Sequence, residues 1–119
     1  MKLTNAQMFE SLAVLSQLEE EGILGFAIAQ NRRRIANELT EYHAKRDELL
    51  AEYGAELKPG QFTLTPEAAQ KFTEALQPYS DMTADVAIRQ VSVDDFCSGS
   101  LTSSQMYTLY WMVEEDEIE

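Results

Sequence analysis

His43 is the only histidine in the chain and the first residue to consider as a general base. Asp47 lies four residues further on, so on a helix its carboxylate could orient the imidazole. Catalysis requires a complete constellation of nucleophile, base and stabilising groups, and the sequence around His43 does not supply one. We therefore interpret His43 as a helix-surface histidine within an interface, and we predict no catalytic residues and no enzymatic activity.

Cys97 is the only cysteine, which rules out a disulfide within the chain. Its surroundings at residues 96–100, Phe-Cys-Ser-Gly-Ser, differ from the Gly-x-Ser-x-Gly motif that presents a nucleophile at a strand-to-helix turn. We predict a semi-buried, inert thiol in a loop over these residues.

Asp94 and Asp95 are adjacent acids, and five of the last six residues are acidic as well. Carboxylates can bind divalent cations, but neither segment has the spaced oxygen ligands and central glycine of an EF-hand loop. We interpret both segments as solvated acidic surface, and we predict neither a metal site nor a cofactor.

Arg32, Arg33 and Arg34 form the one basic cluster. Consecutive residues on a helix point about 100° apart, so three arginines in a row do not form one flat patch. Arg32 falls on an apolar seam, where its stem could pack while its guanidinium pairs with an acid such as Glu19. The alternative is a contact to phosphate, which the negative charge of the rest of the chain disfavours.

Tyr107, Tyr110 and Trp111 bring aromatic side chains together near the end of the sequence. Aromatic residues are favoured both in protein cores and at the energetic centres of interfaces. On a helix, Trp111 points away from Met106, Tyr110 and Val113, the expected inner face. Trp111 is therefore the best single candidate for contact with a partner, and burial in the core is the alternative.

The chain of 119 residues has a formal net charge of −12, which is unevenly distributed. Residues 1–53 contain nine acids and six bases, whereas residues 54–119 contain twelve acids and three bases, a net charge of −9. Such a surface disfavours nucleic acids and anionic membranes, which are also negative, and suits a protein with a basic groove. The alternative is that the acidity only keeps a small protein soluble.

These observations predict a partner-binding surface built from aromatic and acidic residues near the end of the sequence. It comprises Trp111, Tyr107, Asp94, Asp95, Glu114, Glu115, Asp116 and Glu117. No apolar run approaches the roughly 20 residues of a membrane-spanning helix, and no apolar signal-peptide region follows Lys2. We therefore expect a cytoplasmic protein without a membrane partner.

The stretch from Ile23 to Tyr53 is the element around which the rest of the chain is organised. Apolar and amphipathic residues recur along it at alternating spacings of four and three, the heptad pattern that turns one helix face toward a partner. This seam consists of Ile28, Arg32, Ile35, Leu39, Tyr42, Arg46, Leu49 and Tyr53. No proline interrupts it and Gly54 follows as a stop signal, so we predict one long helix.

A shorter helix is predicted before it, from Asn5 to about Glu20. Thr4 and Gln7 have the spacing of a capping box, and a hydrophobic staple pairs the residues just outside it, at positions 3 and 8. Only a short connection, flanked by Gly22 and Gly25, leads into the long helix, which implies an antiparallel hairpin over residues 4–53.

Residues 54–113 are predicted to form a small α/β part with two short strands and two helices. A type II turn at residues 58–61 precedes a short strand at residues 62–64. A helix then begins after Thr65 as its N-cap, and Pro78 ends it.

After a loop at residues 81–84, the β-branched residues of the 86–93 segment predict the second strand. The two strands could pair in a β-α-β unit or antiparallel, and the sequence leaves both options open. The opening pattern Leu-Thr-x-x-Gln-Met recurs at residues 101–106, which predicts the same caps for a last helix from Thr102 to Val113 or Glu114.

The first helix is too short to cover the second half of the long one. The residues left in need of a cover are Tyr42, Leu49, Leu50 and Tyr53. We predict that the C-terminal part packs there, mainly through Phe72, Leu76, Ile88 and Leu109. The predicted fold class is thus mainly α (α+β), in a single domain over residues 1–119 that ends in a solvated acidic tail at residues 114–119.

Two groups of short stretches also resemble a known family. They are residues 1–8, Ala29-Gln30-Asn31, Ile35 and Glu38-Leu39 in the first half, and residues 91–96 and 101–106 in the second. Together these stretches resemble a family of small proteins from tailed bacteriophages and prophages of Gram-positive bacteria. The resemblance implies a phage origin and action inside a bacterial cell, and it carries over no activity and no functional residues.

Small acidic phage proteins often act by binding host or phage proteins. We therefore predict a non-enzymatic inhibitor or modulator of a host protein, such as a defence nuclease whose basic groove the acidic surface would occupy. The alternative is a structural or assembly factor of the phage that oligomerises through the long helix, for example as a homodimer.

Overall fold

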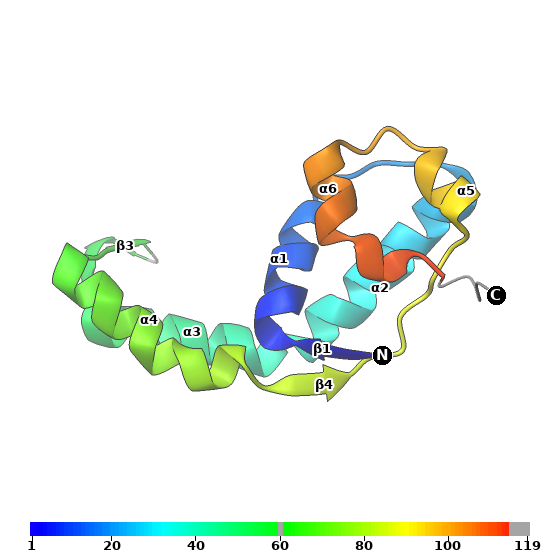
Figure 1. The fold of residues 1–119 in the computed structure, drawn as a ribbon. Helices are drawn as coiled ribbons and strands as arrows, with labels where there is room; N and C mark the ends of the chain where they lie inside the picture. Colours follow the sequence, from blue (N-terminus) through cyan, green and yellow to red (C-terminus); the bar gives the residue numbers. More distant parts are fainter. Residues whose placement is uncertain (60, 115–119) are drawn as a thin grey trace.

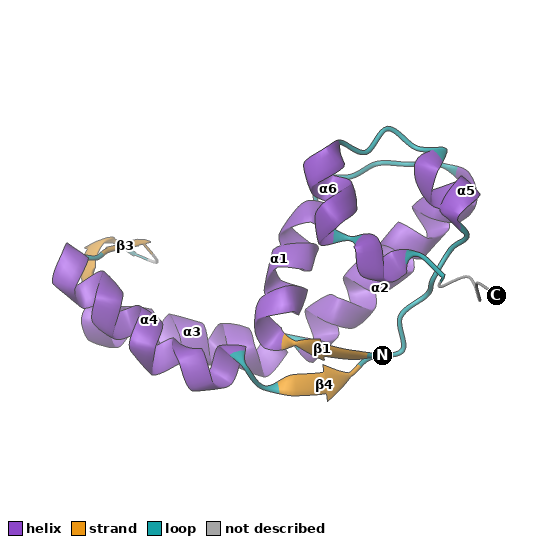
Figure 2. Ribbon diagram, in the orientation of Figure 1, coloured by secondary structure: helices purple, strands orange, loops and turns teal. Residues whose placement is uncertain are grey.

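In a computed structural model that describes residues 1–59 and 61–114, the chain forms a helical head and a helical arm (Figure 1). The head contains β1 (Lys2–Thr4), α1 (Asn5–Leu15), α2 (Gly22–Glu38), β4 (Thr83–Asp85), α5 (Val93–Cys97), α6 (Ser103–Thr108) and the 3₁₀ helix η1 (Tyr110–Met112). The arm contains α3 (Thr40–Tyr53), β2 (Ala55–Lys58), β3 (Gln61–Thr63) and α4 (Pro66–Ser80). Helices dominate and the strands form small two-stranded sheets (Figure 2), which confirms the mainly α class.

The prediction of one long helix over residues 23–53 is wrong, because the helix bends at Leu39 and separates into α2 and α3. Leu39 leaves helical geometry with φ −85° and ψ 1°. The Thr40 hydroxyl donates to the carbonyl of Asn37 at 3.0 Å, a side-chain contact that bends helices. The apolar spacing continues unbroken through the bend, so the heptad pattern contained no sign of it.

The apolar seam residues from Ile28 to Leu49 are nevertheless buried, by different partners on either side of the bend. Ile28 and Ile35 pack in the head, where α1 lies against α2, and Leu39 is fully buried at the junction. In the arm, α4 packs along α3 and covers Tyr42 and Leu49.

The predicted cover of the second half is therefore correct for Phe72 and Leu76, which are buried on α4. It is wrong for the other two residues. Leu109 follows α6, which packs against α1, and Ile88 lies in a segment that hydrogen bonds hold along α2. The C-terminal part thus divides between head and arm, because the chain returns to the head after α4.

Arg32, a seam position, is exposed, and no acid within the described residues forms an ion pair with it, contrary to the predicted pairing with Glu19. Arg46, also on the seam, instead lies over the rings of Phe9 and Phe72, at 5.2 and 5.8 Å from their centroids. Arg46 therefore joins α1, α3 and α4 at the base of the arm.

Helix α1 begins as predicted, with a reciprocal capping box between Thr4 and Gln7, but it ends at Leu15 rather than near Glu20. Residues 16–21 connect the two helices, and α2 starts at Gly22 with a φ of +69°. Gly25 is required by packing, since a Cβ there would lie 2.0 Å from the carbonyl oxygen of Glu20. The connection is thus fixed by glycines at both predicted positions.

Neither predicted strand pairing is found. The 61–63 strand β3 pairs antiparallel with β2 in a hairpin at the tip of the arm, and β4 pairs antiparallel with β1. The predicted turn at residues 58–61 includes Gly60, which lies outside the described residues. The β1–β4 pairing depends on β1, a strand within the expected capping segment, so local patterns alone did not reveal it.

Strand β4 occupies a predicted loop, whereas the expected strand at residues 86–93 forms only one isolated bridge, between Val91 and Val113, and its last residue, Val93, begins α5. Helix α4 also continues through Pro78 to Ser80. Its last turn is held from outside, because the Asn5 amide donates to the Tyr79 carbonyl at 2.8 Å. This contact offsets the loss of the backbone hydrogen bond that the proline ring removes.

Near the C-terminus, the predicted loop at residues 96–100 is wrong in its first part, because α5 runs to Cys97 with Ser92 as N-cap. The last helix has its predicted capping box but stops at Thr108, and η1 follows. A 3₁₀ helix turns about 120° per residue instead of 100°. The change turns Met112 inward and leaves Tyr110 69% exposed, although the sequence predicted Tyr110 on the inner face.

Candidate protein-binding cleft

A cleft of about 310 Å³ lies in the head between α1 and the α6–η1 segment. It is lined by Gln7, Glu10, Ser11, Tyr107, Thr108 and Trp111. Helix α6 packs against α1 even though about a hundred residues separate them in sequence (Figure 1). The cleft therefore exists only because the C-terminal segment folds back over the first helix.

Trp111 forms a fixed wall of this cleft. Its side chain is half-buried, and the indole N–H donates to the hydroxyl of Ser11 at 2.9 Å. Ser11 is itself buried in α1, so the hydrogen bond sets the orientation of the ring. Trp111 thus fits both predicted roles, core residue and contact residue, because one part of the indole packs inside while the other lines the cleft.

Tyr107 and Tyr110 are the most exposed large hydrophobic side chains in the described part of the chain, at 86% and 69%. Tyr107 lines the cleft directly, and Tyr110 is the neighbour of Trp111 in sequence. Exposed tyrosines beside a concave surface are a common composition for the centre of a protein interface. We call Tyr107, Tyr110 and Trp111 the aromatic ledge.

The structure brings only part of the predicted partner-binding surface together. Trp111 and Tyr107 share the cleft, whereas Asp94 is exposed on α5, which packs against α2. The Asp95 carboxylate accepts a hydrogen bond from Ser92 within the helix cap.

Glu114 is exposed, and its backbone N–H donates to the carbonyl of Val91 at 2.8 Å. Glu115, Asp116 and Glu117 lie outside the described residues. The predicted acidic residues that the structure describes thus lie outside the lining of the cleft.

Glu10 and Ser11 line the cleft but were absent from the predicted set. Glu10 is exposed and places a carboxylate at the cleft, and Ser11 orients the tryptophan. Both fall within the predicted first helix, where no pattern distinguishes them from their neighbours. Their role depends on a tertiary contact across a hundred residues, which leaves no local signal in the sequence.

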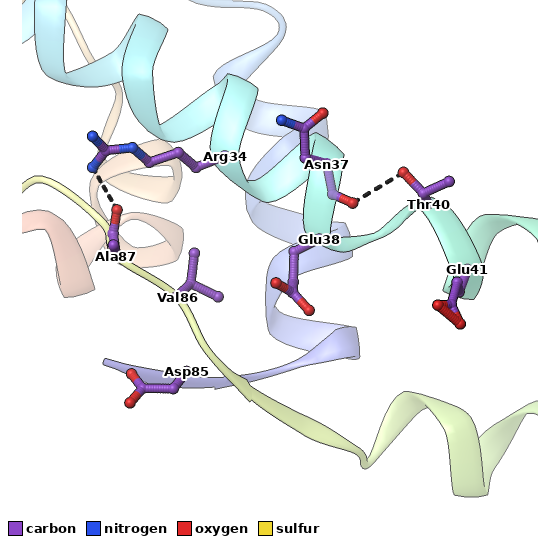
Figure 3. A pocket seen from close by; sticks show the side chains of 8 residues that line it. All are labelled: Arg34, Asn37, Glu38, Thr40, Glu41, Asp85, Val86 and Ala87. Carbon is purple, nitrogen blue, oxygen red and sulfur yellow. Dashed lines mark hydrogen bonds between the residues drawn. The ribbon is translucent and has the colours of Figure 1, made fainter.

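A larger recess of about 540 Å³ lies at the bend between α2 and α3 (Figure 3). It is lined by Arg34, Asn37, Glu38, Thr40, Glu41, Asp85, Val86 and Ala87. Two of its charged groups already have partners. The Arg34 guanidinium donates to the Ala87 carbonyl at 2.5 Å, and the Asp85 carboxylate accepts from the Met1 ammonium at 2.8 Å.

That ammonium holds the pKa of Asp85 below its ordinary value, first through the hydrogen bond and then through its charge. Within the described residues, no group of three acidic, histidine or cysteine side chains is arranged to hold a metal ion. We therefore assign the recess a structural role at the junction of α2, α3 and β4.

The residues weighed for catalysis lie far apart. His43 is half-buried on α3, where its ring packs edge-to-face against Phe9 at 5.6 Å, in the predicted interface between helices. Cys97 ends α5 and is exposed, which corrects the predicted semi-buried thiol. Helix α3 lies in the arm and α5 on the far side of the head (Figure 1), so these two side chains do not share a site.

Among the helices in the described part of the chain, none combines the length and apolar character needed to cross a membrane. Comparisons of the chain with protein-family models, with curated proteins and with solved structures found no match. The resemblance to small phage proteins therefore stays a prediction from the sequence.

Proposed function

We propose that this protein is a non-enzymatic binding protein that engages a partner protein through the cleft and its aromatic ledge. The observation that carries the proposal is the exposure of Tyr107 in the lining of a cleft whose wall is an oriented tryptophan, with the exposed Tyr110 next to that tryptophan in the chain. A partner that covers these rings removes apolar surface from water without ordering long, flexible side chains.

Aromatic side chains of this kind can dominate the energetics of an interface. The few hot-spot residues of an interface each cost about 2 kcal/mol or more when they are truncated to alanine, and tryptophan, tyrosine and arginine are enriched among them. Trp111 is already held by Ser11, so little rotational freedom is lost at that side chain on binding.

Charge favours a partner with a basic surface. The chain carries a net charge of −12, and Glu10 places a carboxylate within the cleft itself. Opposite charges on two surfaces speed their encounter and select the partner, and salt weakens both effects. A host protein with a basic groove, such as a defence nuclease of a bacterium infected by a phage, fits this description and the family resemblance.

The alternative, a phage assembly factor that oligomerises through the long helix, requires an open apolar seam. The seam residues Ile28, Ile35, Leu39, Tyr42 and Leu49 are all buried within the single chain. No observation therefore favours oligomerisation by that route, and we place the binding function first.

Affinity purification from infected bacterial cells, followed by mass spectrometry, tests the proposal. The bait would be compared with the double variant Tyr107→Ala/Tyr110→Ala and with Met82→Ala, a matched control because Met82 is also about half exposed but follows α4. We expect one partner that wild type and the control retain, that the double variant loses, and that rising salt releases. Retention by the double variant, or binding indifferent to salt, would contradict the proposal.

A further inference from the structure

A second surface, distinct from the cleft, lies on the outward face of α2. Ile23, Phe26, Gln30 and Arg33 follow one another at spacings of three, four and three, which places them on one stripe of the helix. Ile23 and Phe26 are 62% and 56% exposed, and Arg33 is exposed as well. We call these four residues, with Arg89 beside them, the α2 stripe.

Arg89 is held over the stripe by two side-chain contacts. Its guanidinium carbon lies 5.3 Å from the centroid of the Phe26 ring, a cation–π distance. Its Nε donates to the side-chain oxygen of Gln30. The side chain therefore has a fixed place on the surface instead of extending into solvent.

A buried polar residue fixes the backbone of Arg89. Asn31 is fully buried, its amide nitrogen donates to the Arg89 carbonyl at 2.9 Å, and its oxygen accepts from the Arg89 N–H at 2.7 Å. A buried amide is costly unless it is fully hydrogen-bonded, and here both of its groups are used on one residue. The segment after β4 is thereby tied to α2 at the point where Arg89 meets Phe26.

The charge of this stripe is opposite to that of the molecule. Within the described residues, no carboxylate forms an ion pair with Arg33 or Arg89, although acids outnumber bases 21 to 9 in the whole chain. A guanidinium with free N–H groups is suited to bind a carboxylate through two parallel hydrogen bonds. The stripe thus offers oriented positive charge next to exposed apolar side chains.

From this combination we infer that the α2 stripe binds an acidic peptide segment of a partner protein, in which carboxylates lie next to an apolar side chain. The carboxylates pair with Arg89 and Arg33, and the apolar side chain packs between Ile23 and Phe26. A nucleic acid fits less well, because the net charge of −12 repels its many phosphates more strongly than a few carboxylates, and Ile23 and Phe26 contribute nothing to phosphate binding. The inference does not depend on the cleft, whose proposed partner has the opposite charge.

Fluorescence anisotropy with a defined probe tests this inference. The probe is a fluorescein-labelled peptide of sequence Glu-Glu-Ile-Glu-Glu-Phe, compared with its glutamine counterpart and with a labelled single-stranded oligonucleotide of similar charge. We expect the acidic peptide to bind in a salt-dependent manner and at least tenfold more tightly than the other two. Equal binding of the glutamine peptide, tighter binding of the oligonucleotide, or no binding of the acidic peptide would overturn the inference.

Variants locate the binding on the stripe. Arg89→Gln and Phe26→Ala are each expected to raise the Kd for the acidic peptide about tenfold, which corresponds to about 1.4 kcal/mol. Lys71→Gln, which removes one positive charge from an exposed position on α4, is the charge-matched control and should leave the Kd unchanged. Both test residues have exposed side chains, so circular dichroism should show an unaltered fold. An unchanged Kd in both stripe variants would place the peptide elsewhere.

Discussion

At the scale of single residues, the hydrogen bond between Trp111 and Ser11 has the largest consequence for the candidate site. It joins residues one hundred positions apart and sets the wall of the cleft. The sequence predicted Trp111 and Tyr107 as contact residues because bulky aromatics stand out in any local pattern. It did not predict Ser11, because a serine on an amphipathic helix is informative only once its distant partner is known.

Ser11→Ala should reduce stability and loosen the cleft together. The variant removes the hydrogen-bond acceptor of the indole N–H and leaves a small void beside α1. Together these changes should lower the free energy of unfolding by about 1 kcal/mol. Urea denaturation measures the loss, and Ser16→Ala, at an exposed position after the same helix, serves as control. A Ser11→Ala protein as stable as the control would indicate that the hydrogen bond contributes nothing.

Asp85 gives the fold a dependence on pH. The Met1 ammonium lowers the pKa of this carboxyl, so the ion pair stabilises the fold above the ordinary carboxyl pKa, and this contribution is lost as the pH falls through the lowered value. Asp85→Asn should therefore show a smaller loss of stability on acidification than wild type. The effect is small because the pair is solvent-exposed. Identical stability profiles between pH 6 and about pH 3 would contradict the assignment.

At the scale of elements, the capping signals proved reliable, whereas the strand pairs and several helix ends were not predicted. Both capping boxes, at Thr4 and Thr102, were predicted because the pattern and its hydrogen bonds lie within four residues. The pairing of β1 with β4 and the helical turn past Pro78 are maintained by contacts from distant parts of the chain, which override local propensity. The bend at Leu39 coincides with the local hydrogen bond from Thr40 to Asn37, which the heptad spacing does not reveal.

Leu39 is the element-scale residue with the clearest expected effect. Its side chain is fully buried where α2 ends and α3 begins, so Leu39→Ala should lower the free energy of unfolding by about 2–5 kcal/mol. Leu50→Ala is the matched control, since Leu50 is only half-buried on α3 and should cost clearly less. Chemical denaturation compares the two, and equal losses would show that the junction does not depend on Leu39.

At the scale of the whole molecule, a small contact region joins the head and the arm. Phe9 on α1 meets Tyr42 and His43 on α3 at ring distances of 5.8 and 5.6 Å, and Arg46 lies over its face. The sequence predicted that the C-terminal part would cover the arm, and α4 does so. It did not predict that the segment after α4 would return to the head and form the cleft against α1, because no local pattern marks where the chain leaves the arm.

Phe9→Ala should weaken this joint more than it unfolds either part. Removal of the ring takes away three aromatic or cationic contacts, so the arm should sample a wider range of orientations. Small-angle scattering should then report a radius of gyration above that of wild type, whereas Phe26→Ala, an exposed phenylalanine of α2, should leave it unchanged. Matching radii for wild type and Phe9→Ala would show that other contacts hold the arm.

Photo-crosslinking in infected bacterial cells tests the central claim most directly. A benzophenone amino acid would replace Tyr107 at the cleft in one protein and Met82, the control position, in another. The binding function predicts a single crosslinked partner protein from position 107, with little or none from position 82. A crosslink of equal strength from both positions, or none from position 107 in cells where the protein is abundant, would contradict it.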